Sequence, residues 1–143
     1  MIRIAHAEDF PRAAALAAAL WEHHEPEALV SEFSAMDPAS NVIFLAFEEE
    51  QAVGFAHCSL RRDYVEGSDR SPTGYLEGIF VLPQFRRRGI AKALLAAGER
   101  WAKENGCAQF ASDCELENTQ SERFHRSLGF AEANRLIFFI KPI

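Results

Sequence analysis

The sequence predicts an α/β domain in which a mixed sheet carries helices on its faces. Segments of strand composition alternate along the chain with segments whose apolar residues recur at helical spacing. The 143 residues suit one domain, residues 1–143, with its own core. Because 48% of the residues are hydrophobic and no repeat, low-complexity tract or linker interrupts them, neither disorder nor a second domain is expected.

The first part of the chain is predicted to hold three strands and two helices. In order they are strand Ile2–Ile4, a helix from Phe10, a helix from about Pro26 to Met36, and strands Val42–Glu48 and Ala52–Leu60. Asp9 precedes Phe10-Pro11, and proline suits the first turn of a helix. Asp37-Pro38 ends the second helix. The polar turn EEEQ joins the two later strands as a hairpin.

The rest of the chain is predicted to alternate strands and helices after a polar stretch, RRDYVEGSDRSPTG, that is long enough to be a functional loop. The predicted elements are strand Tyr75–Leu82, helix Gly89–Asn105, strand Cys107–Ser112, a short helix opened by Thr119 and stopped by Gly129, and strand Leu136–Lys141. Thr119-x-x-Glu122 is a capping-box pattern, with Phe124 and Leu128 facing inward. The predicted order is β-α-α-β-β-β-α-β-α-β.

The charge and the cysteine and histidine content limit the kinds of ligand and the cellular compartment that are expected. The net charge of −6 favours a cationic ligand over nucleic acid, although ordinary solubility would give the same charge. Three cysteines, an odd number without a secretory signal, indicate reduced thiols in the cytoplasm. The run AAALAAALW is too short to span a membrane and reads as a buried helix face. The five histidines show no metal-ligand spacing, so no metal is expected.

The stretch LEGIFVLPQFRRRGIAK carries the clearest chemical signal. A strand runs into a turn with three arginines, and a helix begins at Gly89, where unpaired amides favour a phosphate or pyrophosphate. A solvated basic turn that merely starts a helix is the alternative. Gly78 lies inside the strand, and such a glycine often marks a bulge that leaves backbone N–H groups free.

The pattern Arg86-x-x-Gly89-x-Ala91 resembles the central motif (Q/R)-x-x-G-x-(G/A) of the GCN5-related N-acetyltransferases, and the element order resembles that family along the whole chain. The resemblance implies acetyl-CoA as cosubstrate. Its pyrophosphate would be held by the turn residues Arg86, Arg87, Arg88, Gly89, Ile90 and Ala91, and its pantetheine arm by Ile79, Phe80 and Val81. Asn118 matches the family's pantetheine-contacting asparagine, and it is also a plausible N-cap.

Several further motifs resemble the aminoglycoside 6'-N-acetyltransferases. They are LWEHH, RRDYVEGSDRSP, FASD and ENTQSERFHRSLGF, and the match is weakest from about Glu25 to Gln51. The resemblance implies a drug amine as acceptor, a homodimer in which Tyr64 reaches the partner's site, and substrate contacts from Trp21, His24, Tyr64, Glu77 and Asp113. Trp21 could instead be the apolar end of a helix, His24 an exposed helix-end histidine, and Asp113 a turn residue.

The chemistry of amine acetylation gives Glu77 its predicted role. An ammonium group must lose a proton before it attacks a thioester, and a carboxylate can accept that proton directly or through water. Strand alternation would place Glu77 on the same face as Ile79, near a covered face or cleft, whereas a surface-facing acid is the alternative. No general acid is assigned, since the only tyrosines are Tyr64 and Tyr75.

One position departs from the family pattern. Asn134 stands where the family often has a second acid, which weakens charge attraction for a polyamine but leaves acetyl transfer intact. The leading hypothesis is therefore direct transfer from acetyl-CoA to a cationic amine in a ternary complex, with no nucleic acid or membrane as partner. Two alternatives stay open: the same fold acting on a polyamine or protein amine, and a CoA-binding module without catalysis.

Overall fold

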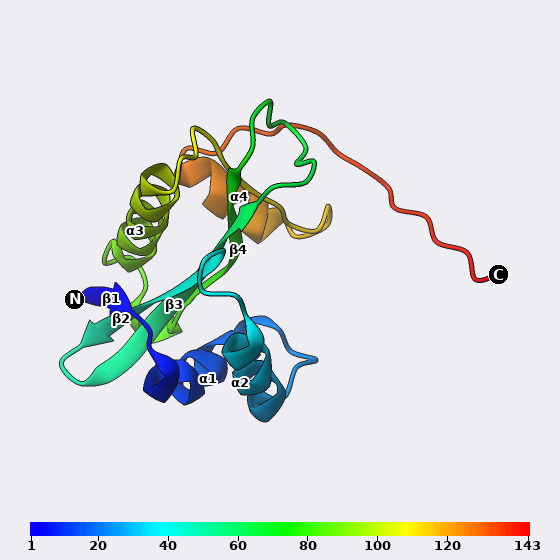
Figure 1. Cartoon of the computed structure of the whole chain (residues 1–143). Coiled ribbons are helices and arrows are strands. Elements are labelled where there is room, and N and C mark those ends of the chain that lie inside the picture. The colour runs from blue at the N-terminus through cyan, green and yellow to red at the C-terminus, as the bar shows by residue number, and fades with distance from the viewer.

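The fold is built on a five-stranded mixed sheet with the strand order β1-β2-β3-β4-β5, in a computed structural model that describes residues 1–143 (Figure 1). The strands are β1 (Ile2–Ile4), β2 (Asn41–Glu48), β3 (Gln51–Arg61), β4 (Thr73–Val81) and β5 (Phe110–Ser112). The first four strands are antiparallel neighbours, whereas β5 runs parallel to β4.

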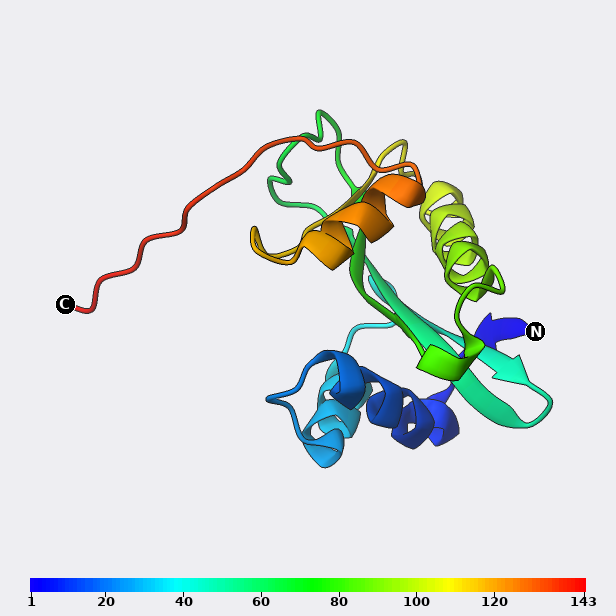
Figure 2. The same ribbon diagram turned by 180° about the vertical axis from the view of Figure 1, so that it is seen from behind.

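Four α-helices and two short 3-10 turns cover the two faces of the sheet. They are α1 (Phe10–Leu20), α2 (Pro26–Ala35), α3 (Ile90–Glu104), α4 (Thr119–Ser127), η1 (Ala7–Asp9) and η2 (Pro83–Phe85). Helices α1 and α2 lie on one face and α3 and α4 on the other, as Figures 1 and 2 show from opposite sides. No helix is both long enough and apolar enough to cross a membrane.

The core forms two layers, one on each face of the sheet. On the first face, α1 packs through Ala13, Ala14 and Ala17, whose side chains are fully buried. Alanine side chains let a helix approach the sheet closely, which explains the alanine run. On the second face, α3 buries Leu94 and Leu95 against the sheet. The predicted fold class, a mixed sheet with helices on its faces, is confirmed.

Most predicted elements are confirmed within a few residues, but one strand is wrong. The segment predicted as a strand, Leu136–Lys141, forms no strand and runs away from the sheet as an exposed, extended segment (Figure 1). Its composition is that of a strand, yet a strand needs a neighbour to accept its backbone hydrogen bonds. Within one copy of the chain, this segment has no such neighbour. The strand predicted from Cys107 also begins later, at Phe110.

The predicted bulge is present, but Glu77 rather than Gly78 is the extra residue. Leu76 pairs with Cys58 and Gly78 pairs with His57, so Glu77 has no partner in β3. The extra residue changes the alternation. Ile79 packs in the layer beneath α3, whereas Glu77 lies toward α1 and α2, so the expectation that both share a face is wrong.

Gly78 is needed for a different reason. A Cβ built on Gly78 would lie 2.5 Å from Cζ2 of Trp21, a distance that side chains do not adopt. The absent side chain therefore lets the indole ring rest directly on β4, beside the bulge. Trp21 also meets Phe55 edge-on, with ring centroids 5.9 Å apart.

Two side chains near helix starts behave differently from one another. Asp9 is not the side-chain cap of α1; its carboxylate instead accepts hydrogen bonds from Arg3 Nη1 (2.6 Å) and Nη2 (2.9 Å), which ties β1 to η1. Asn118 does cap α4, because its Oδ1 accepts a hydrogen bond from Ser121 N (3.0 Å). The cap is thus one residue earlier than Thr119, where the capping-box pattern placed it.

Candidate active site

The turn between β4 and α3 has the backbone of an anion-binding loop. Arg87 (φ 63°) and Gly89 (φ 78°) both adopt left-handed conformations, and α3 begins at Ile90. Ala93 N donates to Gly89 O, so the amides just before it in α3 have no acceptor within the helix. Alternation of left-handed and extended residues turns successive N–H groups toward one concavity, which suits a phosphate. A hollow of about 140 Å³ adjoins this turn.

The arginines of the turn have different surroundings. Arg86 Nε donates to Val81 O (2.8 Å), and its guanidinium lies 5.3 Å from the centroid of the Phe80 ring, so this side chain holds the turn against the end of β4. Arg88 lies over Phe85, with 5.2 Å between guanidinium carbon and ring centroid. Arg86 therefore holds the loop in its shape. It also contributes the positive charge that was expected from the sequence.

Strands β4 and β5 separate beside this turn. Their parallel pairing covers Gly74, Tyr75 and Leu76 and ends there, although β4 continues to Val81. On the side away from β3, residues 77–81 of β4 therefore have a free edge. This edge contains Ile79, Phe80 and Val81, and an extended amide-containing arm could pair with it as a strand would. Asn118, at the start of α4, has its Oδ1 occupied by the cap, which leaves its NH₂ group as a donor.

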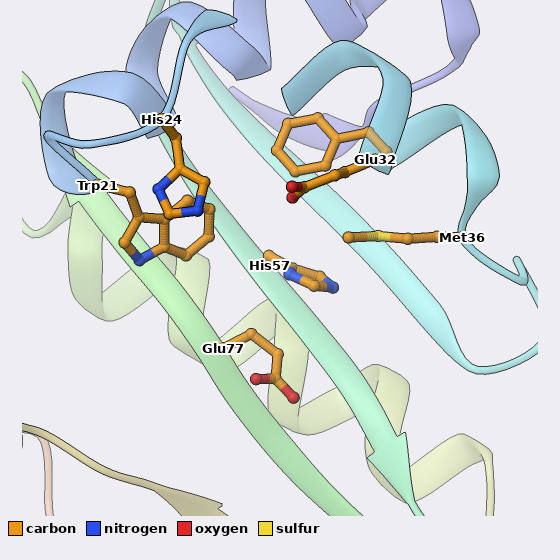
Figure 3. Close-up of a pocket in the computed structure, with 7 residues that line it drawn as sticks. Trp21, His24, Glu32, Met36, His57 and Glu77 are labelled. Atoms are coloured by element: carbon orange, nitrogen blue, oxygen red, sulfur yellow. The ribbon is translucent and has the colours of Figure 1, made fainter. Parts of the chain in front are cut away.

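A cavity of about 330 Å³ lies on the other face of the sheet, between β3, β4, α2 and the end of α1 (Figure 3). Seven residues line it: Trp21, His24, Glu32, Phe33, Met36, His57 and Glu77. The lining contains two carboxylates and neither lysine nor arginine. Such a lining suits a cationic guest, because the carboxylates attract its charge and the aromatic rings offer their faces.

Glu77 is held rigidly at the floor of this cavity. Its Oε1 accepts hydrogen bonds from Ser59 Oγ (2.7 Å) and Arg61 Nε (2.9 Å), and its Oε2 accepts one from Arg61 Nη2 (2.7 Å). Burial raises the pKa of Glu77, but the hydrogen bonds from Arg61 and Ser59 outweigh that effect and bring the pKa below its ordinary value. The carboxylate is thus ionised near neutral pH.

Arg61 is held in turn by a second layer of contacts. Its guanidinium carbon lies 3.4 Å from the centroid of the Tyr75 ring, and the Tyr75 hydroxyl donates to Asp113. Burial and the Asp113 carboxylate raise the pKa of Tyr75, so its hydroxyl stays protonated. Asp113 is thus linked to Glu77 through Tyr75 and Arg61, and it is not among the residues that line the cavity.

His57 is a cavity residue that the sequence did not single out. Its Nε2 donates to Asn41 Oδ1 (3.0 Å), and burial lowers its pKa, so the ring is neutral near pH 7. His57, Ser59 and Arg61 alternate along β3, and this period of two is the signal that could have placed all three beside Glu77. Glu32 lies in α2 and Met36 directly follows that helix. Their spacing of four residues was the corresponding helical signal.

Two further predicted substrate residues, Tyr64 and Asn134, also lie outside the cavity. Tyr64 is 81% exposed on the loop between β3 and β4, where its hydroxyl donates to Glu66. Asn134 contacts the same loop, since its Nδ2 donates to Glu66 Oε1 (2.7 Å). Trp21, His24 and Glu77, by contrast, come together in the cavity (Figure 3). A single copy of the chain thus assembles only part of the predicted acceptor site.

Comparison with known proteins agrees with this geometry. An aminoglycoside N(6')-acetyltransferase type 1 of Salmonella typhimurium is 46% identical over 123 residues, which are 85% of each chain. Two solved structures of the aminoglycoside N-acetyltransferase AAC(6')-Iy align with 100% of this chain at 41% identity. The first is a complex with CoA; the TM-score is 0.94 and the alignment covers 95% of that chain. The second is a complex with the bisubstrate analogue CoA-S-monomethyl-acetylneamine; the TM-score is 0.93 and the alignment covers 98% of that chain.

The family assignment follows from the extent of the match. The model of the acetyltransferase (GNAT) family matches residues 3–130, which include the turn, the separating strands and the cavity. The chain therefore belongs to the acetyltransferase (GNAT) family.

Proposed function

We propose that the protein transfers the acetyl group of acetyl-CoA to the 6'-amine of an aminoglycoside. The observation that carries the choice of acceptor is the cavity, which is lined by Glu32 and Glu77 without a lysine or arginine. An aminoglycoside carries several ammonium groups, and these carboxylates would hold them. The relatives that match along most of the chain are named aminoglycoside N(6')-acetyltransferases, which supports the same acceptor.

The turn and the free edge of β4 are proposed to bind acetyl-CoA. Amides from Arg86 to Ala91 would bind its pyrophosphate, the free edge at Ile79, Phe80 and Val81 would pair with the pantetheine arm, and Asn118 would donate to that arm. The bulge at Glu77 lies where this edge meets the cavity. The thioester and the acceptor amine would therefore meet next to the Glu77 carboxylate.

Glu77 is proposed to bind the acceptor ammonium and to accept its proton. Oε2 receives only one hydrogen bond, so a lone pair remains for the ammonium. The freed amine nitrogen attacks the thioester carbonyl carbon, the C–S bond breaks, and CoA leaves as the thiolate. The nitrogen, which carries one proton too many for an amide, releases that second proton to water. Because Arg61 keeps the pKa of Glu77 low, the proton is passed on to water rather than kept.

Direct transfer, without an acetylated enzyme, is supported by the position of the thiols. Cys58 is buried beneath α3, and burial raises the pKa of its thiol to about 12. Cys107 is also buried, and none of the three cysteines lines the cavity. A nucleophilic cysteine needs a thiolate that the substrate can reach.

Trp21 and His24 are proposed to contact the sugar rings, and Tyr64, Asp113 and Asn134 to complete the acceptor site in a homodimer. The exposure of Tyr64 and its contact with Glu66 fit a loop that meets a second copy. Asn134 stands on the same surface, so its effect on the acceptor would also come through that interface. Because the cosubstrate is an intracellular metabolite, we propose a cytoplasmic location.

The decisive experiment mixes the protein with acetyl-CoA and a panel of amines and measures release of the CoA thiol. Turnover is expected with aminoglycosides that carry a 6'-amine and should be lost with their 6'-hydroxyl analogues. Polyamines and peptides serve as controls for the same fold with another acceptor. Turnover restricted to those controls would overturn the proposed acceptor, and acetyl-CoA binding without any turnover would indicate a CoA-binding module.

A further inference from the structure

His57 has a ring nitrogen that no other group of the protein uses. The residue is only 6% exposed, and its side chain lines the cavity together with Glu77 (Figure 3). Nε2 lies 3.0 Å from Asn41 Oδ1, whereas Nδ1 forms no hydrogen bond. Every side-chain nitrogen or oxygen that is fully buried has a hydrogen-bond partner. Nδ1 is therefore not sealed in the core, and a guest in the cavity can reach it.

The surrounding hydrogen bonds determine which nitrogen of the ring carries the proton. Asn41 Nδ2 donates to Asp37 O (3.2 Å), and this bond orients the amide so that Oδ1 faces His57. An amide oxygen can only accept a hydrogen bond, so His57 Nε2 carries the proton. In a neutral imidazole the other nitrogen then has a lone pair. The ring thus presents one hydrogen-bond acceptor, Nδ1, to the cavity.

His57 and Glu77 are neighbours on the wall of the cavity. His57 in β3 pairs with Gly78 in β4, and the bulged residue Glu77 comes directly before Gly78. Glu77 Oε2 receives one hydrogen bond, from Arg61, and keeps a lone pair for an ammonium group. A primary ammonium has three N–H donors, so an ammonium bound at Oε2 has donors left for other acceptors. Nδ1 of His57 is such an acceptor on the adjacent strand.

We propose that Nδ1 of His57 accepts a hydrogen bond from the acceptor ammonium that Glu77 binds, which makes His57 a substrate-binding residue. This role rests on the proposed function, because the ammonium is that of the aminoglycoside. Glu77 attracts the ammonium by its charge, whereas a neutral imidazole adds a direction without a second charge. Two acceptors on different strands therefore fix the orientation of the nitrogen as well as its position.

Protonation of the His57 ring would abolish this contact. An imidazolium has no lone pair at Nδ1 and repels an ammonium. Burial is the largest influence on the pKa of His57 and lowers it; the Glu77 carboxylate opposes that effect and Arg61 adds to it. The other titratable groups that line the cavity are His24, from the segment after α1, and Glu32, from α2. Because the pKa of His57 lies below its ordinary value, the ring accepts a proton only below about pH 6.5.

Two substitutions separate the roles of the two ring nitrogens. In His57→Gln the side-chain NH₂ group takes the place of Nε2 and can donate to Asn41, but no acceptor stands in the place of Nδ1. In His57→Asn the side-chain oxygen takes the place of Nδ1, whereas the bond to Asn41 is lost. Binding of neamine, a two-ring aminoglycoside with a 6'-amine, is measured by calorimetry at neutral pH. It should weaken about tenfold in His57→Gln and at most about threefold in His57→Asn.

A measurement on the unmodified chain keeps the proposal falsifiable if either variant folds poorly. Nitrogen-15 spectra of the histidine rings should show the His57 proton on Nε2, and saturating neamine should move the Nδ1 resonance toward that of a protonated nitrogen. The same spectra locate the pH at which the ring titrates. Neamine binding to the unmodified chain should weaken through that pH, relative to its binding to His57→Asn, and this ratio cancels the titration of neamine itself and of His24.

A purely structural role for His57 predicts the opposite order of the variants, because His57→Asn is the one that loses the bond to Asn41. Weaker binding to His57→Asn than to His57→Gln, or equal binding to all three chains, would therefore overturn the role of Nδ1. An Nδ1 resonance that saturating neamine leaves in place would do the same. An unmodified chain that binds acetyl-CoA but no neamine would overturn the proposed function, and the role of His57 with it.

Discussion

The turn from Pro83 to Ala91 and the cavity lined by Glu32 and Glu77 are proposed to bind their ligands by different means. The turn is one continuous stretch, and its chemistry comes from backbone amides aligned by left-handed residues such as Gly89. The cavity is made of side chains from β3, β4, α2 and the end of α1, which are distant in sequence. A constant pyrophosphate can be bound by backbone, whereas a particular polyamine requires side chains, and these can change without altering the turn.

The largest expected effect tests whether the two regions are functionally separate. In Glu77→Gln the side chain keeps its shape but loses the charge and the ability to accept a proton. Turnover should fall by about 100-fold or more, the range for loss of a general base. Affinity for acetyl-CoA, measured by calorimetry, should stay within about twofold, because the turn does not involve this carboxylate.

Glu32→Gln is the matched control, since Glu32 lines the same cavity from α2 and forms no hydrogen bond or ion pair with β4. It should raise KM for the acceptor while kcat changes little, because it removes attraction and not proton transfer. Normal turnover in Glu77→Gln, or an equal loss of kcat in both variants, would contradict the assigned base.

A smaller effect is expected from Gly78→Ala, which alters the cavity through its wall. The new Cβ would lie 2.5 Å from Cζ2 of Trp21 and push the indole ring from its place. Overpacking of this kind costs about 1–3 kcal/mol. Displacing the ring should raise KM for the acceptor about tenfold, measured in steady-state assays with acetyl-CoA saturating.

The control is Gly74→Ala, because Gly74 lies in β4 like Gly78. The added Cβ would lie 2.6 Å from Phe110 Cδ2 in β5 and would not meet Trp21. This variant should lose thermal stability to a similar degree and keep its acceptor KM. If both glycines affected KM equally, the contact between Trp21 and β4 would have no special role in acceptor binding.

The same contrast explains what could be predicted from the sequence. The turn was predicted because its spacing, Arg86-x-x-Gly89-x-Ala91, lies within a few residues, and Glu77 because it adjoins that stretch. His57 and Arg61 were missed, since their meeting with Glu77 depends on the register between β3 and β4. A one-residue bulge changed which face Glu77 occupies, and composition alone does not fix the position of a bulge.

The segment Leu136–Lys141 was predicted as a strand for a related reason. Alternation and β-branched or aromatic residues report what a segment can do, not whether a neighbour is available to pair with it. Residues 136–140 have the right composition, but the attachment at Asn134 leads them away from β5 of the same copy. The strand prediction was therefore wrong because the composition of a segment does not tell whether a pairing partner lies beside it.

The smallest expected effect concerns the turn. Gly89 has φ 78° and open space where a Cβ would lie, so Gly89→Ala adds conformational strain without a clash. A left-handed residue other than glycine costs about 1 kcal/mol, which corresponds to about fivefold in an equilibrium constant. Relief of that strain would rotate the amides of the turn, so KM for acetyl-CoA should rise about fivefold while KM for the acceptor stays constant. Gly106→Ala is the control, because Gly106 has φ 89° and equally open space at the opposite end of α3. It should lose a similar amount of stability and bind acetyl-CoA normally; equal KM values for acetyl-CoA in the two variants would remove the turn from the binding site.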